Sequence, residues 1–266
     1  MSAIDELFIR LRRDGQKAFL PFITAGDPDL GFTRQLLRML DQLGCSMAEV
    51  GIPYSDPIAD GPVIQASYTR ALHKKIKLHQ IFDEIGQLKP TLKMPLVTMV
   101  SYAVIHRVGP AAFVDQAQAA GFAGAIVPDL LVEESQLFSS ICRAKDFSHI
   151  QLVTPTTPTE RAIQIAERST GFLYFVSVTG ITGERSELPS GLVERVEWLR
   201  QRTPLPICIG FGVSRPEHVR LLAPVADGLI VGSAIVRHIA TAENGQAQTA
   251  LANIEQLVKN LMAAID

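Results

Sequence analysis

Short apolar runs alternate with helix-length amphipathic segments along almost the whole chain, and this alternation constrains the fold more than any other feature. Such runs predict buried strands, and the segments between them are long enough for the crossovers that parallel strands need. We expect eight strands, at about Phe19–Ile23, Met47–Gly51, Leu96–Val100, Gly124–Pro128, Ile150–Thr154, Phe172–Ser177, Ile207–Gly210 and Gly228–Val231.

Amphipathic patterns predict the connecting helices, at Leu30–Leu43, Leu78–Leu88, Ala111–Ala120, Glu133–Ala144, Thr159–Arg168, Leu192–Arg202 and Pro216–Leu222. Eight strand-helix units favour a closed parallel barrel of the α/β class, a (β/α)8 TIM barrel, because open doubly wound sheets usually have fewer strands. An open sheet would also tend to show a Gly-rich dinucleotide turn after its first strand. The turn here reads Thr24-Ala25-Gly26-Asp27-Pro28 and lacks that fingerprint.

Three further helices extend this plan. The apolar residues of the N-terminal segment recur at helical spacing and predict a helix that covers one end of the fold. The second unit is long enough for an extra helix around Val63–His73, and Ala247–Ile265 predicts a closing C-terminal helix. No linker or shift in composition divides the chain, so we expect residues 1–266 to form a single domain.

Charge and composition argue against several classes of protein. A net charge of −2 gives no reason to expect nucleic acid or an anionic membrane as partner. No apolar run approaches the roughly 20 residues that span a bilayer, and charged residues interrupt the N-terminal segment, which argues against an export signal. The 6 His are scattered and the 3 Cys lie far apart, so neither a metal site nor a disulfide is indicated. We expect a soluble cytoplasmic protein.

A rigid acidic loop, rich in Pro and Gly, follows the second strand and carries Glu49, Asp56 and Asp60. Asp56 is interpreted as a turn residue, because Asp side chains bond nearby backbone N–H groups. Glu49 lies inside an apolar strand, where an ionised carboxylate costs several kcal/mol unless it is paired or used in chemistry. A structural ion pair is the alternative for Glu49.

Active sites of such barrels gather where the strands end. The seventh strand ends in Gly210-Phe211-Gly212-Val213-Ser214 and the eighth in Gly232-Ser233-Ala234, which runs into a helix. Gly allows close approach of an anion, and a helix start offers N–H groups, so these turns predict a phosphate site. Ser233 is alternatively, or in addition, a helix N-cap. The polar loop after the sixth strand is interpreted as a lid or as a plain surface loop.

The chain resembles the tryptophan synthase alpha chain family in several motifs, which occur in the family's order and span nearly the whole chain. These motifs are Phe22–Pro28, the acidic loop Glu49–Pro62, Ser177–Gly183 and the two phosphate turns. The resemblance implies a lyase that cleaves indole-3-glycerol phosphate to indole and glyceraldehyde 3-phosphate. It also implies a beta chain that receives the indole, in an alpha2-beta2 heterotetramer. Pyridoxal phosphate would belong to the beta chain, so no cofactor is expected in this chain.

The resemblance assigns roles by position. Glu49 and Asp60 would be the catalytic pair; substrate would be bound by Phe22, Tyr174 and Phe211 around the indole, by Gly183, Gly212, Gly232 and Ser233 at the phosphate, and by Thr182 of the closing loop. Two positions depart from the family pattern. Leu131 stands where the family usually has Pro, which affects the local loop and its contact with the beta chain, and Phe172 replaces a frequent Tyr with little expected effect.

The reaction explains the need for two carboxylates. A proton must reach the ring carbon, another must leave a side-chain hydroxyl, and the ring nitrogen gains positive charge. Glu49, partly desolvated, would have a raised pKa and act as acid and base, while Asp60 would stay ionised and stabilise the ring cation.

Three alternatives remain open on the sequence. A metal-using epimerase or the synthase of indole-glycerol phosphate shares the phosphate turns, but the first needs His ligands and the second a catalytic Lys at a strand end, and neither is present there. A free-standing lyase without a beta partner is the second alternative. The third is a catalytically silent barrel that activates a partner, which the retention of Glu49 and Asp60 argues against.

Overall fold

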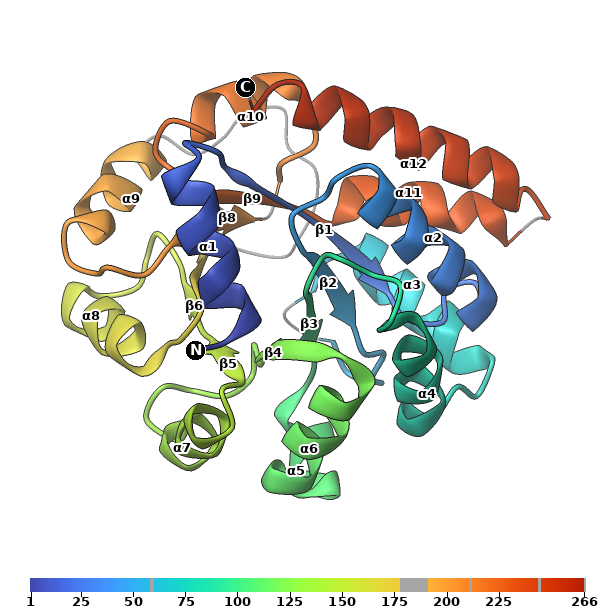
Figure 1. The fold of residues 1–266 in the computed structure, drawn as a ribbon, viewed down its shortest axis with the longest axis horizontal. Helices are drawn as coiled ribbons and strands as arrows, with labels where there is room; N and C mark the ends of the chain where they lie inside the picture. Colours follow the sequence, from blue (N-terminus) through green and yellow to red (C-terminus); the bar gives the residue numbers. More distant parts are fainter. Residues whose placement is uncertain (58–59, 178–190, 211, 244, 266) are drawn as a thin grey trace.

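The computed structural model describes residues 1–57, 60–177, 191–210, 212–243 and 245–265. Within these ranges the strands are all parallel and form one sheet in the order β5-β4-β3-β2-β1-β9-β8-β7-β6. Their bounds are β1 (Ala18–Thr24), β2 (Ala48–Gly51), β3 (Leu96–Met99), β4 (Phe122–Ile126), β5 (Ser148–Ile150), β6 (Leu152–Val153), β7 (Leu173–Val176), β8 (Ile207–Gly210) and β9 (Gly228–Val231). Figure 1 shows these strands at the centre with helices around them, and the predicted barrel is confirmed.

The barrel closes through a divided strand. The sequence predicts one strand at Ile150–Thr154, whereas the structure has β5 and β6, separated only by Gln151. β5 pairs with β4 and β6 pairs with β7, so the two ends of the sheet are joined by the chain itself. The backbone carbonyl of Gln151 accepts a hydrogen bond from the N–H of Tyr174 at 3.1 Å, which fastens the junction to β7.

The helices confirm the predicted plan, including the three additional ones. They are α1 (Ala3–Arg13), α2 (Leu30–Gln42), α3 (Pro62–His73), α4 (Leu78–Leu88), α5 (Tyr102–Val108), α6 (Pro110–Ala120), α7 (Gln136–Ala144), α8 (Thr159–Arg168), α9 (Leu192–Arg200), α10 (Pro216–Leu222), α11 (Ser233–Ala242) and α12 (Ala247–Met262). The short α5 was not predicted. None of the helices in the described ranges is both long enough and apolar enough to cross a membrane.

Helix ends follow local chemistry. The Asp29 side chain accepts a hydrogen bond from the backbone N–H of Phe32 at 2.7 Å and so caps α2. Pro110 opens α6, where a missing N–H costs nothing, and Gly121 ends it at a φ of 101°, a conformation that side chains disfavour. Gly109, at a φ of 93°, separates α5 from α6.

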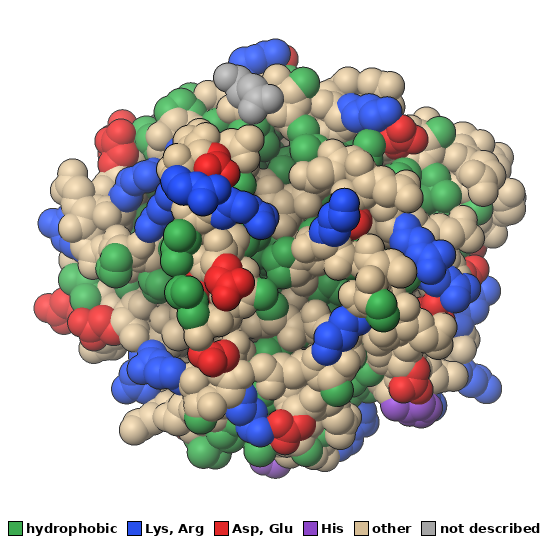
Figure 2. All heavy atoms as spheres, viewed as in Figure 1, with side chains coloured by type: hydrophobic (Ala, Val, Ile, Leu, Met, Phe, Trp, Pro, Cys, Tyr) green, Lys and Arg blue, Asp and Glu red, His purple; other side chains and the backbone are tan. Residues whose placement is uncertain are grey.

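One end of the barrel is closed by α1. Figure 1 shows this helix lying across the strands, and its buried face consists of Ile4, Leu7, Phe8 and Leu11. The ring of Phe8 packs on Phe172, with centroids 5.8 Å apart. On the same face, Figure 2 shows Lys and Arg side chains interspersed with Asp and Glu, without a surface of one sign. The apolar face of α1 thus closes the amino-terminal end of the barrel by packing on its core.

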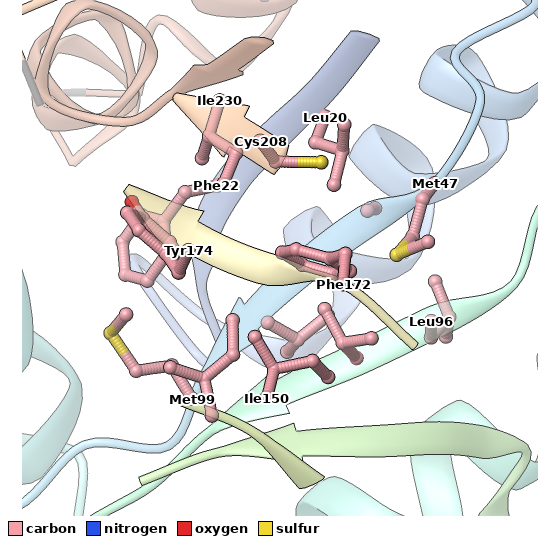
Figure 3. Packing of buried hydrophobic residues seen from close by; sticks show 14 of the residues in the cluster. Leu20, Phe22, Met47, Leu96, Met99, Ile150, Phe172, Tyr174, Cys208 and Ile230 are labelled. Atoms are coloured by element: carbon pink, nitrogen blue, oxygen red, sulfur yellow. The ribbon is translucent and has the colours of Figure 1, made fainter. Parts of the chain in front are cut away.

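Apolar side chains from all around the barrel fill its interior. Figure 3 shows Leu20, Cys208 and Ile230 pointing into this core from three strands, together with Met47 and Phe172, which directly precede β2 and β7. Burying a side chain of this size contributes about 1.5–3 kcal/mol. Because the amino-terminal half is filled and capped, open space remains for chemistry at the opposite end, where the strands stop.

A buried ion pair ties the first loop to α3. The Asp27 carboxylate accepts hydrogen bonds from Arg70, at 2.6 and 2.9 Å, and from the Ser67 hydroxyl group. Arg70 also lies 4.0 Å from Glu243 at the end of α11. This cluster holds α3, the helix that follows the acidic loop, against the loop between β1 and α2 and against the end of α11.

Candidate active site

A pocket opens at the carboxyl-terminal ends of the strands. It is lined by Phe22, Glu49, Asp60, Ile64, Met99, Tyr174, Gly212, Val213, Gly232, Ser233 and Ala234. Seven of the ten predicted site residues are therefore brought together here, from both halves of the chain. The other three, Thr182, Gly183 and Phe211, lie outside the described residues, as does the predicted lid between 178 and 190.

Glu49 is the most unusual group in this pocket. It lies on β2 in register with Phe22 and Val97, and only 1% of its surface is exposed. Neither carboxyl oxygen has a hydrogen-bond partner among the described residues, so the alternative of a structural ion pair finds no partner there. Burial, together with the negative charge of Asp60, raises the pKa of Glu49 to about 8. At pH 7 Glu49 is therefore mostly protonated.

Asp60 faces the same space from the loop after β2. Its backbone is held on both sides, because its N–H donates to Pro57 at 3.0 Å and its carbonyl accepts from the Gln65 side chain at 2.7 Å. Burial raises the pKa of Asp60 to about 6. At pH 7 this carboxyl group is mostly ionised. One protonated and one ionised carboxyl group thus share a desolvated pocket, an arrangement suited to acid–base chemistry.

Apolar side chains form one wall. Phe22, Met99 and Tyr174 come from three different strands and line the same pocket, and Figure 3 shows them toward the same end of the core. Gly210 makes room for this wall, since a Cβ atom there would collide with the Tyr174 hydroxyl group. A flat aromatic ring of a ligand would be in contact with this wall and within reach of the two carboxyl groups.

The ends of β8 and β9, which lie between β1 and β7 in the sheet, form a second wall beside Phe22. Gly212 has a φ of 81°, which favours glycine, and α11 begins at Ser233 directly after Gly232. The first N–H groups of a helix have no partner within it and lie at its positive end. The N-cap residue is Gly232 and no side chain caps this helix, so the interpretation of Ser233 as an N-cap is wrong. Ser233 lines the pocket.

Four lining residues were not predicted: Ile64, Met99, Val213 and Ala234. Met99 is the last residue of β3, so the strand-end rule was sufficient to find it. Ile64 lies in the first turn of α3, and its position depends on how that helix packs. Val213 and Ala234 adjoin predicted Gly and Ser residues of the two turns.

The two departures from the family pattern lie away from the pocket lining. Leu131 follows β4 and is 58% exposed, in a turn where its carbonyl accepts from the N–H of Glu134 at 3.0 Å. Phe172 is fully buried against Phe8 at the closed end of the barrel. The effect of either difference on activity stays a prediction.

Comparison with known proteins agrees with this geometry. A family model described as Tryptophan synthase alpha chain matches residues 8–266. The tryptophan synthase alpha chain of Rhodopirellula baltica is 58% identical over 246 residues, covering 91% of this chain and 88% of the relative. The structure of the tryptophan synthase alpha chain from Legionella pneumophila has a TM-score of 0.90 at 32% identity, covering 100% of this chain and 98% of that chain. A chain in a tryptophan synthase complex from Pyrococcus furiosus has a TM-score of 0.84 at 34% identity, covering 92% of this chain and 98% of that one.

The family match over most of the chain and the agreement in fold lead to one conclusion: this chain belongs to the tryptophan synthase alpha chain family, the lyases that cleave indole-3-glycerol phosphate in tryptophan biosynthesis.

Proposed function

We propose that Glu49 and Asp60 divide the acid–base work of this cleavage between them. The observation that carries the proposal is the buried carboxyl group of Glu49, without a hydrogen-bond partner among the described residues and with a pKa raised to about 8, in one pocket with Asp60, whose pKa is about 6. A solvent-exposed pair of carboxyl groups would both be ionised at pH 7 and could not supply the proton that the indole ring needs.

The proposed sequence of steps conserves protons and electrons. Glu49 gives its proton to the ring carbon that bears the glycerol chain, and the Asp60 carboxylate accepts a hydrogen bond from the ring N–H as positive charge develops. Glu49, now ionised, removes the proton of the hydroxyl group on the adjacent carbon. That hydroxyl becomes an aldehyde, the bond to the ring breaks, and its electron pair returns to the ring. Indole and glyceraldehyde 3-phosphate leave, and Glu49 is protonated again.

The two walls orient the substrate. We assign the indole ring to the side of Phe22 and Tyr174, and the phosphate group to Gly212, Gly232 and Ser233 at the start of α11. Binding at both ends places the bond to be broken between them, beside Glu49. Positioning of this kind contributes to rate because the reacting groups no longer have to meet by diffusion.

The partner and setting follow from the family. One structural relative is part of a tryptophan synthase complex, and we propose that a beta chain likewise docks on this chain and receives the indole. An alpha2-beta2 assembly, pyridoxal phosphate confined to the beta chain, a cytoplasmic location and a single domain spanning 1–266 belong to the same proposal.

The test is the rate of indole release from indole-3-glycerol phosphate, with and without a beta chain. Glu49→Gln is expected to lower turnover by about 10²–10⁴-fold or more in both conditions, because an amide cannot transfer the proton. The matched control is Asp56→Asn on the same loop, where the side chain is exposed and bonded to Ser55, and its turnover without partner should equal wild type. Near-normal turnover of Glu49→Gln would remove Glu49 from the reaction. Wild-type indole release that is seen only with the beta chain would identify a partner-dependent lyase. No indole release in either condition would identify a catalytically silent barrel that activates a partner.

A further inference from the structure

Tyr68 on α3 carries a buried polar atom that the steps above do not use. Its side chain is 1% exposed, and its hydroxyl group has no hydrogen-bond partner among the described residues. Leaving such a group unpaired inside a protein is unfavourable, whereas Phe would fill the same space without that cost. An orphaned hydroxyl group beside a pocket therefore points to a partner that is present only during function.

The backbone of β2 creates the space for this hydroxyl group. A Cβ atom on Gly51 would lie 2.7 Å from the Tyr68 oxygen and 2.7 Å from Cζ of Phe22. Only glycine leaves this space free. Successive side chains of a strand point to opposite faces, so Gly51 and Glu49 belong to one face of β2. The Tyr68 hydroxyl group thus lies on the face of β2 from which Glu49 enters the pocket, next to the aromatic wall.

We propose that Tyr68 is a positioning residue for the known reaction: its hydroxyl group donates a hydrogen bond to the Glu49 carboxylate once that side chain has given its proton to the indole ring. The proposal rests on the acid–base role proposed above for Glu49. Neither Glu49 oxygen has a partner in the part of the chain that the structure describes, so the carboxylate formed in this step needs a donor in a place from which water is largely excluded. The proposed bond requires rotation of the Glu49 side chain toward the Tyr68 hydroxyl group, and Tyr68 keeps its own proton throughout.

The other groups around Glu49 agree with this role. Asp60 adds negative charge, while Tyr174 from β7 and Cys208 from β8 are neutral because burial raises the pKa of each well above its usual range. Burial, followed by the charge of Asp60, likewise holds the pKa of Tyr68 well above its usual range. Its phenol therefore donates a hydrogen bond and does not ionise.

Thr24 is the competing acceptor. It pairs with Gly51 in the sheet, is buried, and its hydroxyl group also lacks a partner in the described structure. A bond from Tyr68 to Thr24 would stabilise the fold without affecting the ionisation of Glu49. The pH at which Glu49 titrates thus distinguishes the two acceptors.

The experiment titrates Glu49 directly in the free chain, by infrared difference spectroscopy of its carboxyl group with Glu49→Gln as the blank. In Tyr68→Phe the ionised form loses its donor, so we expect the pKa of Glu49 to rise by about one unit above that of wild type. We expect kcat to fall about 10-fold and the alkaline limb of the pH profile to move to higher pH. Glycerol phosphate affinity and thermal stability at pH 7 should not fall.

Thr98→Val is the matched control. Thr98 also has a buried hydroxyl group that no described residue bonds, but it is in register with Val50, on the face of the sheet opposite to Glu49. Loss of the Thr98 hydroxyl group should leave the pKa of Glu49 and kcat unchanged. If the pKa of Glu49 and kcat are both unchanged in Tyr68→Phe, the proposal is overturned, whether or not the variant loses stability. If Glu49→Gln is inactive in that case, only the role of Tyr68 is wrong, whereas an active Glu49→Gln overturns the proposed function itself.

Discussion

A buried carboxyl group such as that of Glu49, which has no hydrogen-bond partner within the described ranges, makes the stability of the folded chain depend on pH. In the unfolded chain this group has its ordinary pKa of 4.5, and in the folded chain its pKa is about 8. Between these values the folded state binds a proton that the unfolded state has released. Stability is therefore fully retained below pH 4.5 and is lost as the pH rises through this window.

We expect Glu49→Gln to remove this dependence. Gln keeps the shape of the protonated side chain and cannot ionise, so the variant and wild type should have similar stability near pH 4.5. The variant should gain up to about 1.4 kcal/mol relative to wild type per pH unit above that, until the difference levels off above pH 8. Urea unfolding followed by circular dichroism from pH 4.5 to 9 measures the difference. A difference that stays constant over this range would mean that Glu49 ionises normally in the folded chain.

Individual residues differed in how well the sequence predicted them. The burial of Glu49 on a strand was predictable from the apolar residues around it, and its catalytic role stays a proposal, motivated by the cost of burying a carboxylate there. Tyr68 was not predictable, because at its helical position it is indistinguishable from a core residue. Its relation to the pocket depends on the missing side chain of Gly51, which belongs to a separate element. Contacts of this kind arise only when two elements have packed together.

At the scale of elements, periodicity placed the strands and most helices, since it reports directly which side chains are buried. It predicted β8 and β9 with the bounds that the structure shows, and also α4, α8 and α10. It placed β4 two residues too late and did not divide β5 from β6. That division depends on hydrogen bonds to two different neighbours, which the local sequence does not encode.

The start of α11 provides the prediction at this scale. A Cβ atom on Gly232 would lie 3.6 Å from the Phe22 side chain, an ordinary contact, so the position tolerates a small side chain. Gly232→Asp would place a negative charge where we propose that the phosphate binds, and we expect at least about 10-fold weaker binding of glycerol phosphate with little change in Tm. Gly232→Ala controls for the added volume and should bind within about threefold of wild type. Calorimetry at fixed salt concentration measures the affinity of each variant for glycerol phosphate. Equal affinity in wild type and both variants would exclude this turn from the phosphate site.

At the scale of the whole molecule, the two ends of the barrel have different tasks. The amino-terminal end is filled with apolar side chains and closed by α1, which favours stability. The carboxyl-terminal end keeps two carboxyl groups with raised pKa values, together with the hydroxyl groups of Thr24 and Tyr68, for which the described part of the chain supplies no partner, and all of these are unfavourable for stability. We expect catalysis at this end of the barrel to be faster when the pocket is covered, because exclusion of water strengthens the electrostatic interactions of the bound substrate.

The proposed beta chain is the candidate for that cover, and Leu131 tests where it docks. This side chain is 58% exposed and follows β4 at the carboxyl-terminal end of the barrel. An exposed apolar residue near a polar site is suited to a partner interface, and an Asp there would have to be desolvated on docking. Leu131→Asp should therefore raise the beta-chain concentration needed for half-maximal stimulation of indole release by about 10-fold or more. Turnover of the free chain should not change.

Ile9 on α1 provides the matched control, because it is equally exposed, at 57%, but lies at the opposite end of the barrel. Ile9→Asp introduces the same charge and should leave the titration with beta chain unchanged. Equal weakening by both variants would indicate a general effect of charge, and no weakening by Leu131→Asp would place the beta chain away from the loop that follows β4. Because Leu131 stands where the family usually has Pro, Leu131→Pro adds a third measurement. If the loop is already held in shape by its own turn bond to Glu134, this variant should bind the beta chain as wild type does.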